Sequence, residues 1–198
     1  LAMHTHELAY EQLSAAHPHL AAANHSIHVG DLLAIAEEEL PTRHMADLVI
    51  GGPPCQGFSV AGKMDPNDER SKHVFHFLGM VERVNPRAFV MENVKALYQN
   101  ARWAKVRTAL IDRAQGLGYS TLLTLVNAAD FGVPQARERM FLLGIRHDCG
   151  TAAPLIPTTP SHHFSVRDAL SQLPKYGTPG NDSLCSAQIT AAKSPGLR

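Results

Sequence analysis

The sequence predicts an α/β fold with a doubly wound, mostly parallel sheet. Short apolar runs alternate with segments of helical periodicity, and this order is typical of βαβ crossovers. Two of the runs, Asp47–Ile50 and Ala88–Met91, are almost continuously apolar, as strands buried on both faces are. Gly51-Gly52 follows the first run and Glu92 follows the second. Because ligands bind at the carboxyl ends of strands in open α/β sheets, we expect functional groups at these two positions.

The other elements are predicted from periodicity, capping residues and turn formers. Helical spacing predicts helices at about 7–16, 32–40, 71–84, 101–117 and 164–173. Asp31 and Ser165 stand where N-caps of the second and the last of these are expected. Further strands are predicted at 27–29, 120–126 and 140–145. A loop rather than a helix joins the last two strands, which allows one of them to run antiparallel.

Composition indicates one ordinary globular domain over residues 1–173. The chain has 198 residues, 44% of them hydrophobic, and 18 basic residues balance 18 acidic ones. The segment 174–198 contains Gly, Ser, Asn and Pro without periodicity, which predicts a linker or a disordered tail. The three cysteines, Cys55, Cys149 and Cys185, have no paired spacing, so neither a disulfide framework nor a structural zinc site is expected. No apolar run approaches the roughly 20 residues that span a bilayer.

The loop from Gly51 to Ser59 carries the strongest chemical signal. Its sequence, Gly-Gly-Pro-Pro-Cys-Gln-Gly-Phe-Ser, places Cys55 after two prolines that stiffen the backbone. A thiol on a rigid loop at the carboxyl end of a strand is a candidate nucleophile. The alternative is a buried structural cysteine, because free Cys behaves as a small hydrophobic residue. The surrounding Gly, Pro and polar residues favour an exposed, reactive Cys55.

The same loop closely resembles the nucleophile loop of the DNA cytosine C5-methyltransferases. Three further matches follow in that family's order: Met91-Glu92-Asn93-Val94 resembles its Glu-Asn-Val motif, and Phe131–Pro134 stands directly before Gln135–Arg139, which resembles its Gln-x-Arg-x-Arg motif. The resemblance covers most of the chain, from about the first helix to about Pro174. It implies a Rossmann-like sheet of the S-adenosylmethionine-dependent methyltransferase type, and DNA methylation as the activity.

The resemblance assigns catalytic roles to four residues. Cys55 is the nucleophile that attacks carbon 6 of a cytosine rotated out of the duplex. Glu92 holds or protonates N3 and contacts the exocyclic amine. Arg139 supports the base and Glu92, and Arg137 contacts the DNA backbone. Since the two arginines are two residues apart, an extended backbone points them the same way. Without the resemblance, an exposed charged edge strand is the preferred interpretation of this pair.

Binding roles are assigned in the same way. Asn93 is expected to brace the loop, and Ser59 and Arg70 to touch phosphates near the extruded base. Gln56 and Gln135 belong to the same DNA-binding or loop-bracing set. The cofactor S-adenosyl-L-methionine is expected to contact Asp31, Leu32 and Pro54, although Asp31 is equally well explained as an N-cap. His4 stands where the family has an acidic ribose-binding residue, so the ribose contact is left open. No metal ligand is expected.

The chain is expected to be truncated at both ends relative to the family. It begins after the glycine-rich cofactor turn and stops before the target-recognition region and the closing motif, so we expect the 198 residues alone to be inactive. The partner is double-stranded DNA, with a full-length monomer in the cytoplasm or nucleoid as a restriction-modification or orphan enzyme. Two alternatives remain: a non-catalytic DNA- or partner-binding remnant or subunit, and a cysteine hydrolase that uses His73 or His76.

Overall fold

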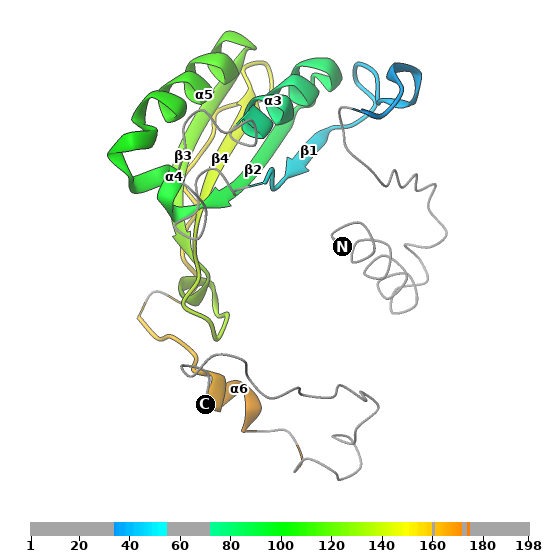
Figure 1. Ribbon diagram of the computed structural model, residues 1–198. Coiled ribbons are helices and arrows are strands. Elements are labelled where there is room, and N and C mark those ends of the chain that lie inside the picture. Colours follow the sequence, from blue (N-terminus) through cyan, green and yellow to red (C-terminus); the bar gives the residue numbers. More distant parts are fainter. Residues whose placement is uncertain (1–33, 55–71, 160, 172–173, 175–198) are drawn as a thin grey trace, which may run out of the picture.

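The computed structural model describes residues 34–54, 72–159, 161–171 and 174, and these residues form a sheet with helices packed on it (Figure 1). The sheet has four strands in the order β1-β2-β4-β3. The strands are β1 (Leu48–Gly51), β2 (Ala88–Val94), β3 (Tyr119–Asn127) and β4 (Glu138–Arg146). The helices are α3 (His73–Val84), α4 (Lys95–Gln99), α5 (Ala104–Gly116) and α6 (Val166–Leu170), and the 3-10 turns are η2 (Glu37–Glu39), η4 (Ala101–Trp103) and η5 (Ala128–Phe131).

The strand directions confirm the mostly parallel sheet. β1 pairs parallel with β2, whereas β4 pairs antiparallel with both β2 and β3. Three strands therefore point one way and β4 alone points the other way. The reversal follows from the direct β3–β4 connection, which has no crossover helix. As a result, the carboxyl ends of β1 and β2 and the amino end of β4 lie at the same end of the sheet, called the site edge below.

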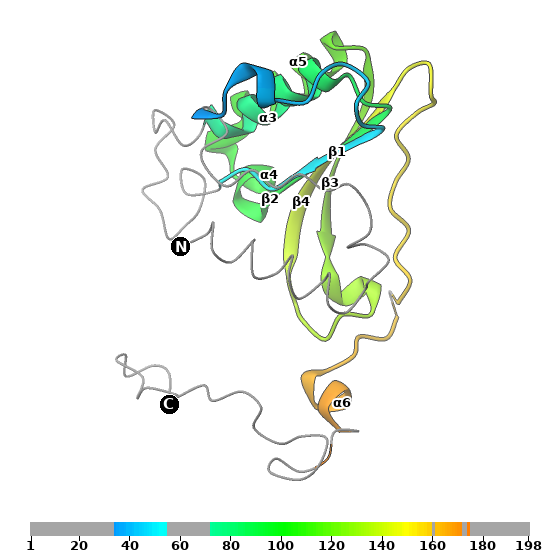
Figure 2. The same cartoon turned by 90° about the vertical axis from the view of Figure 1, so that its right-hand side faces the viewer.

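The core lies between the sheet and helices α3 and α5, which lie side by side on one face (Figure 2). At its centre Phe89 contacts Phe77 and Tyr119 in edge-to-face geometry, with ring centroids 6.1 Å and 5.2 Å apart. Such pairs stabilise a core beyond their buried area. One face of α3 is buried, as its predicted periodicity requires: Val74, Phe77, Leu78, Val81 and Val84. The strands that end at the site edge are therefore supported by a well-packed hydrophobic core.

The helix predicted over 32–40 is wrong for the part that the structure describes. Residues 35–40 contain the single 3-10 turn η2, and Ala36 before it is extended, with φ −58° and ψ 141°. The residue before Pro41, Leu40, is held out of the helical region, with φ −73° and ψ 143°. Arg83 of α3 holds the segment instead, because its guanidinium donates to the carbonyls of Pro41 and Glu37.

Other boundaries differ by smaller amounts. The helix predicted over 101–117 is split into η4 and α5, and Trp103 between them is fully buried. The last helix is shorter than predicted, and Ser165 is its N-cap, within a capping box with Asp168. The elements predicted at 7–16 and 27–29 and the tail 175–198 lie outside the described residues. None of the described helices is long and apolar enough to cross a membrane.

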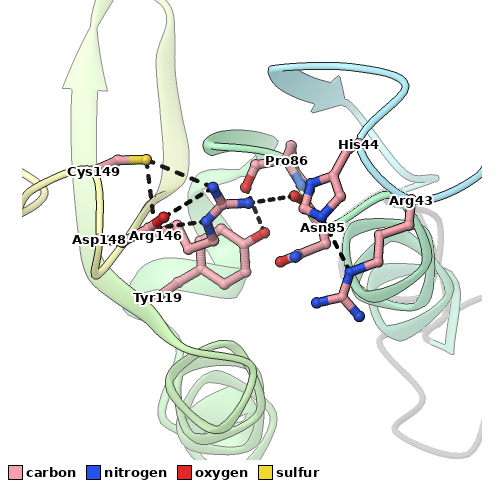
Figure 3. A network of polar contacts seen from close by, with 8 residues as sticks. All are labelled: Arg43, His44, Asn85, Pro86, Tyr119, Arg146, Asp148 and Cys149. Atoms are coloured by element: carbon pink, nitrogen blue, oxygen red, sulfur yellow. Dashed lines mark hydrogen bonds and ion pairs between the residues drawn. The ribbon is translucent and has the colours of Figure 1, made fainter.

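A cluster of polar contacts lies at the end of the sheet opposite the site edge (Figure 3). Arg146, the last residue of β4, donates to Asp148 and to the carbonyl of Asn85. The hydroxyl of Tyr119 donates to the carbonyl of Pro86 at 2.8 Å, and burial raises the pKa of Tyr119. Arg146 also holds the pKa of Asp148 below its usual range. These contacts tie the C-terminal end of α3 to β3 and β4.

We predict that Gly144→Ala destabilises the fold. A Cβ at Gly144 would lie 2.0 Å from the ring of Phe89, its partner across the β2–β4 ladder. Forcing that contact should lower the free energy of unfolding by about 1–3 kcal/mol. Gly116→Ala is the matched control, because a Cβ there meets no atom within 4 Å and lies on a helix, so a small gain is expected. Urea unfolding of both variants tests this; equal stabilities would contradict the packing at Phe89.

Candidate active site

The carboxyl ends of β1 and β2 place Glu92 beside the proline loop. Gly51 pairs with Met91, so Gly52 and Glu92 are the next residues along two adjacent parallel strands. A Cβ at Gly52 would lie 3.5 Å from Glu92 Oε2, which shows how closely the carboxylate approaches that backbone. The Glu92 side chain is 36% exposed. It is thus held at the sheet edge and remains accessible to a ligand.

Asn93 connects β2 to the loop. Its side chain is buried, with a relative exposure of 1%, and it is the buried polar residue of the described core. Its Nδ2 donates to the carbonyl of Pro53 at 3.1 Å, and its Oδ1 accepts from the backbone N–H of Val94 at 2.9 Å. The amide is therefore satisfied on both sides, and it fixes the backbone two residues before Cys55.

Two arginines at the start of β4 reach Glu92. Arg139 Nε lies 3.0 Å from Glu92 Oε1, and Arg137 Nη2 lies 3.8 Å from the same oxygen. Arg139 also donates from Nη1 to the carbonyl of Glu138 at 2.8 Å, which fixes the plane of its guanidinium. Because β4 runs antiparallel to β2, with Arg139 opposite Val94, these side chains arrive at the same edge as Glu92.

A second ion pair borders the first, and the sequence interpretation did not find it. Lys95 Nζ and Glu138 Oε2 are 2.5 Å apart, and each side chain is 42% exposed. Lys95 directly follows the Glu-Asn-Val motif, and Glu138 separates the two arginines. These positions could have indicated the pair, because one residue directly follows the first motif, the other lies within the second, and the two motifs meet in space. Three cations and two carboxylates leave this cluster with one excess positive charge.

Of the other predicted site residues, some lie in the part of the chain that the structure describes and some lie outside it. Gln135 is exposed in the turn before β4, and its backbone N–H donates to the carbonyl of Val133. Pro54 is exposed and Gly52 has no side chain, so the carboxyl end of β1 is open to a bound group, which fits a cofactor there. Six predicted residues lie outside the described residues: Asp31, Leu32, Cys55, Gln56, Ser59 and Arg70. His4 lies outside them as well.

The described residues give no support to a hydrolase or a metal centre. His73 and His76 lie in the first turns of α3, with ring centroids 5.5 Å apart, and the buried Nδ1 of His76 has no hydrogen-bond partner among the described residues. A nucleophile–His pair needs an orienting Asn or Asp on that ring nitrogen. No cluster of three or more His, Cys, Asp or Glu suited to a metal occurs in residues 34–54, 72–159, 161–171 or 174.

The fold and this edge together define an α/β enzyme class with its reactive groups at the carboxyl ends of the strands. Comparison with known proteins specifies the class further. The chain belongs to the C-5 cytosine-specific DNA methylase family, whose model matches residues 7–194. The four motifs of the sequence analysis all lie inside the matched region.

Individual relatives agree with the family match. The chain is 38% identical to the Type II methyltransferase M1.HphI of Haemophilus parahaemolyticus over 170 residues, covering 81% of this chain and 44% of the relative. It is 36% identical to M.AquIA of Picosynechococcus sp., covering 72% of this chain and 66% of the relative. A solved prophage-encoded E. coli protein, described as a DNA modification methyltransferase, superposes with a TM-score of 0.53 at 31% identity, covering 65% of this chain and 35% of that one. The chain thus spans less than half the length of M1.HphI.

We predict that Asn93→Ala loosens the connection between β2 and the loop. The substitution removes the donor to Pro53 and leaves a buried site without its polar partner, so the free energy of unfolding should fall by about 1–3 kcal/mol. Gln99→Ala, at an exposed position of α4, is the control and should stay within about 0.5 kcal/mol of the parent. Thermal and urea unfolding measure both. An Asn93→Ala variant as stable as the control would show that the Pro53 contact contributes nothing.

Proposed function

We propose that the chain carries the catalytic residues of a DNA cytosine C5-methyltransferase that uses S-adenosylmethionine. The observation that supports this most directly is the convergence of three motifs at one sheet edge. The Asn93 amide holds the carbonyl of Pro53, and the Glu92 carboxylate on the same strand forms an ion pair with Arg139. Family membership gives the reaction its class. The activity, substrate and cofactor of the whole protein remain proposals, since the chain spans 44% of M1.HphI.

The chemistry requires a nucleophile and a group that manages charge on the ring. Carbon 5 of cytosine is a poor nucleophile on its own. Attack of the Cys55 thiolate at carbon 6 forms a C–S bond and moves the ring electrons to carbon 5, which can then take a methyl group. Loss of the carbon-5 proton and expulsion of the thiolate restore the aromatic ring. The Pro53–Pro54 backbone, held by Asn93, fixes where Cys55 can begin its attack.

Glu92 and the arginines would bind the flipped base. Glu92 would face N3 and the exocyclic amine, and the accessibility of its carboxyl beside Gly52 supports this role. Arg139 would orient that carboxyl and reach the cytosine O2, since a guanidinium can serve two acceptors at once. Arg137, whose side chain is 47% exposed and lies farther from Glu92, is free to contact a backbone phosphate. The excess positive charge of the cluster favours that contact.

The cofactor and the rest of the DNA would be held by residues around this edge. S-adenosylmethionine, when bound, supplies the electrophilic methyl group, and Asp31, Leu32 and Pro54 are the residues proposed to hold it. Gln56, Ser59, Arg70 and Gln135 are proposed to contact DNA around the extruded base or to brace the loop. A monomeric full-length enzyme in the cytoplasm, acting on double-stranded DNA, is the corresponding biological setting.

We predict that Glu92→Gln lowers the turnover of methyl transfer far more than it weakens DNA binding. The amide keeps the shape of the side chain, but it can neither give a proton to N3 nor pair as a carboxylate with Arg139, so a loss in kcat of about 10²–10³ is expected. Tritium transfer from labelled S-adenosylmethionine to DNA, with detection of 5-methylcytosine, measures kcat in the full-length protein.

Glu138→Gln serves as the control for removing a carboxylate from the same cluster. Parallel filter-binding experiments give the affinity of each variant for DNA. A full-length protein that binds DNA but transfers no methyl group to cytosine would overturn the proposed function. Equal losses in binding and in turnover for Glu92→Gln would assign Glu92 a structural role instead.

A further inference from the structure

We propose that Asn127 is a positioning residue that holds the backbone of Arg137 where the arginine side chain can reach DNA. The inference rests on the proposed function, which gives Arg137 the contact with a backbone phosphate. Asn127 is the last residue of β3 and belongs to none of the motifs of the sequence analysis. Its side-chain oxygen accepts from the N–H of Arg137 at 3.1 Å and from the N–H of Ala129 at 3.2 Å.

The backbone of Arg137 depends on this contact because it lies just before β4, which begins at Glu138. The carbonyl of Arg137 accepts from the N–H of Ala128 at 2.9 Å, as in a regular antiparallel ladder. The reciprocal acceptor, the carbonyl of Ala128, instead accepts from the N–H of Val133 at 3.3 Å. The Asn127 oxygen replaces that carbonyl as the partner of the Arg137 N–H. Both backbone groups of Arg137 are thereby tied to the end of β3.

The turn η5, which supplies the second partner of Asn127, is itself fixed by the chain that follows β4. The turn lies beyond α3 and α5, the helices that cover the sheet (Figure 2). Thr159 donates from its N–H to the carbonyl of Asp130 at 2.8 Å and from Oγ1 to the carbonyl of Ala129 at 3.1 Å. His163 Nε2 lies 2.8 Å from Asp130 Oδ1. Asn127 therefore links Arg137 to a turn that is held from a second side.

The position of this backbone matters because little else fixes the Arg137 side chain. Its Nη2 lies 3.8 Å from Glu92 Oε1, and the side chain is 47% exposed. A guanidinium binds a phosphate through two parallel hydrogen bonds, which require both the correct position and the correct direction. The backbone from which the side chain starts thus decides whether that geometry is reached.

A purely structural role for Asn127 is the alternative, and the chain contains a matched residue for it. Asn127 is the N-cap of η5, and Asn100 is the N-cap of η4, where its side chain accepts from the N–H of Arg102 at 2.9 Å. If capping were the whole role, the two asparagines would be equivalent. They differ because Asn127 also accepts from Arg137. Asn100→Ala is therefore the control that removes a cap alone.

The first test measures methyl transfer by the full-length protein to unmethylated mixed-sequence DNA. Asn127→Ala should raise KM for DNA by roughly tenfold, the contribution of one charge-assisted hydrogen bond, and leave kcat nearly unchanged. Asn127→Asp keeps the oxygen acceptor and should behave as the wild type does, as should Asn100→Ala. In an Arg137→Met background, adding Asn127→Ala should cause no further rise in KM, because both changes remove the same phosphate contact.

A second readout is independent of DNA and of activity. Hydrogen exchange followed by NMR reports whether the amide proton of Arg137 is protected. We expect protection in the wild type and in Asn127→Asp, and its loss in Asn127→Ala. If the wild type neither binds DNA nor transfers a methyl group, the proposed function fails. The exchange result then decides separately whether Asn127 holds Arg137.

Three results would overturn the inference. The first is an Arg137 amide proton that stays protected in Asn127→Ala. The second is a rise in KM that persists in the Arg137→Met background, since Asn127 would then act through another group. The third is a loss of stability in urea unfolding that is much larger for Asn127→Ala than for Asn100→Ala, which would assign Asn127 a structural role.

Discussion

The antiparallel return of β4 beside β2 is the constraint on which the candidate site depends. It places Arg139, the second residue of β4, opposite Val94 at the carboxyl end of β2. A parallel β4 in the same place would carry Arg139 to the far end of β2, roughly 20 Å away at about 3.4 Å per residue. Glu92 would then lose its contacts with Arg137 and Arg139. The direct β3–β4 connection is therefore as important to the chemistry as the motif residues themselves.

The packing divides the molecule into a rigid layer and an adaptable edge. Phe89, Tyr119 and the buried face of α3 fix the sheet, and Asn93 extends that order to Pro53. In contrast, the ion pairs at the edge are 28–47% exposed, and such pairs contribute little to stability. Charged groups that are held weakly can exchange one partner for another when a ligand arrives. A site that must release its guanidinium groups to a base and a phosphate is suited to this arrangement.

Much of this arrangement could be predicted from local patterns. Continuous apolar runs gave the positions of β1 and β2, and the loop between the last two strands allowed one of them to be reversed, as β4 is. The predicted strand ended at Met91, whereas β2 continues to Val94, so Glu92 lies inside the strand near its carboxyl end; its accessible position was nevertheless predicted. The resemblance of the motifs added the reaction class, and the family match bears it out.

Other features depend on contacts that no local pattern encodes. In place of the helix predicted over 32–40, the segment is held by Arg83, more than forty residues away in the chain, which donates to its carbonyls. The Lys95–Glu138 pair requires β2 and β4 to be neighbours, which periodicity alone does not give. The break between η4 and α5 occurs at Trp103, whose side chain is fully buried. Tertiary packing here overrides the local helical preference.

The most direct test of the account is whether Cys55 forms a covalent bond with cytosine. The full-length protein would be incubated with S-adenosylmethionine and DNA that contains 5-fluorocytosine, whose fluorine cannot leave as the carbon-5 proton does. We predict a denaturation-resistant adduct that peptide mapping places on Cys55 and that Cys55→Ser abolishes. An adduct on Cys149, which lies exposed at the opposite end of the sheet, or on Cys185 would contradict the account.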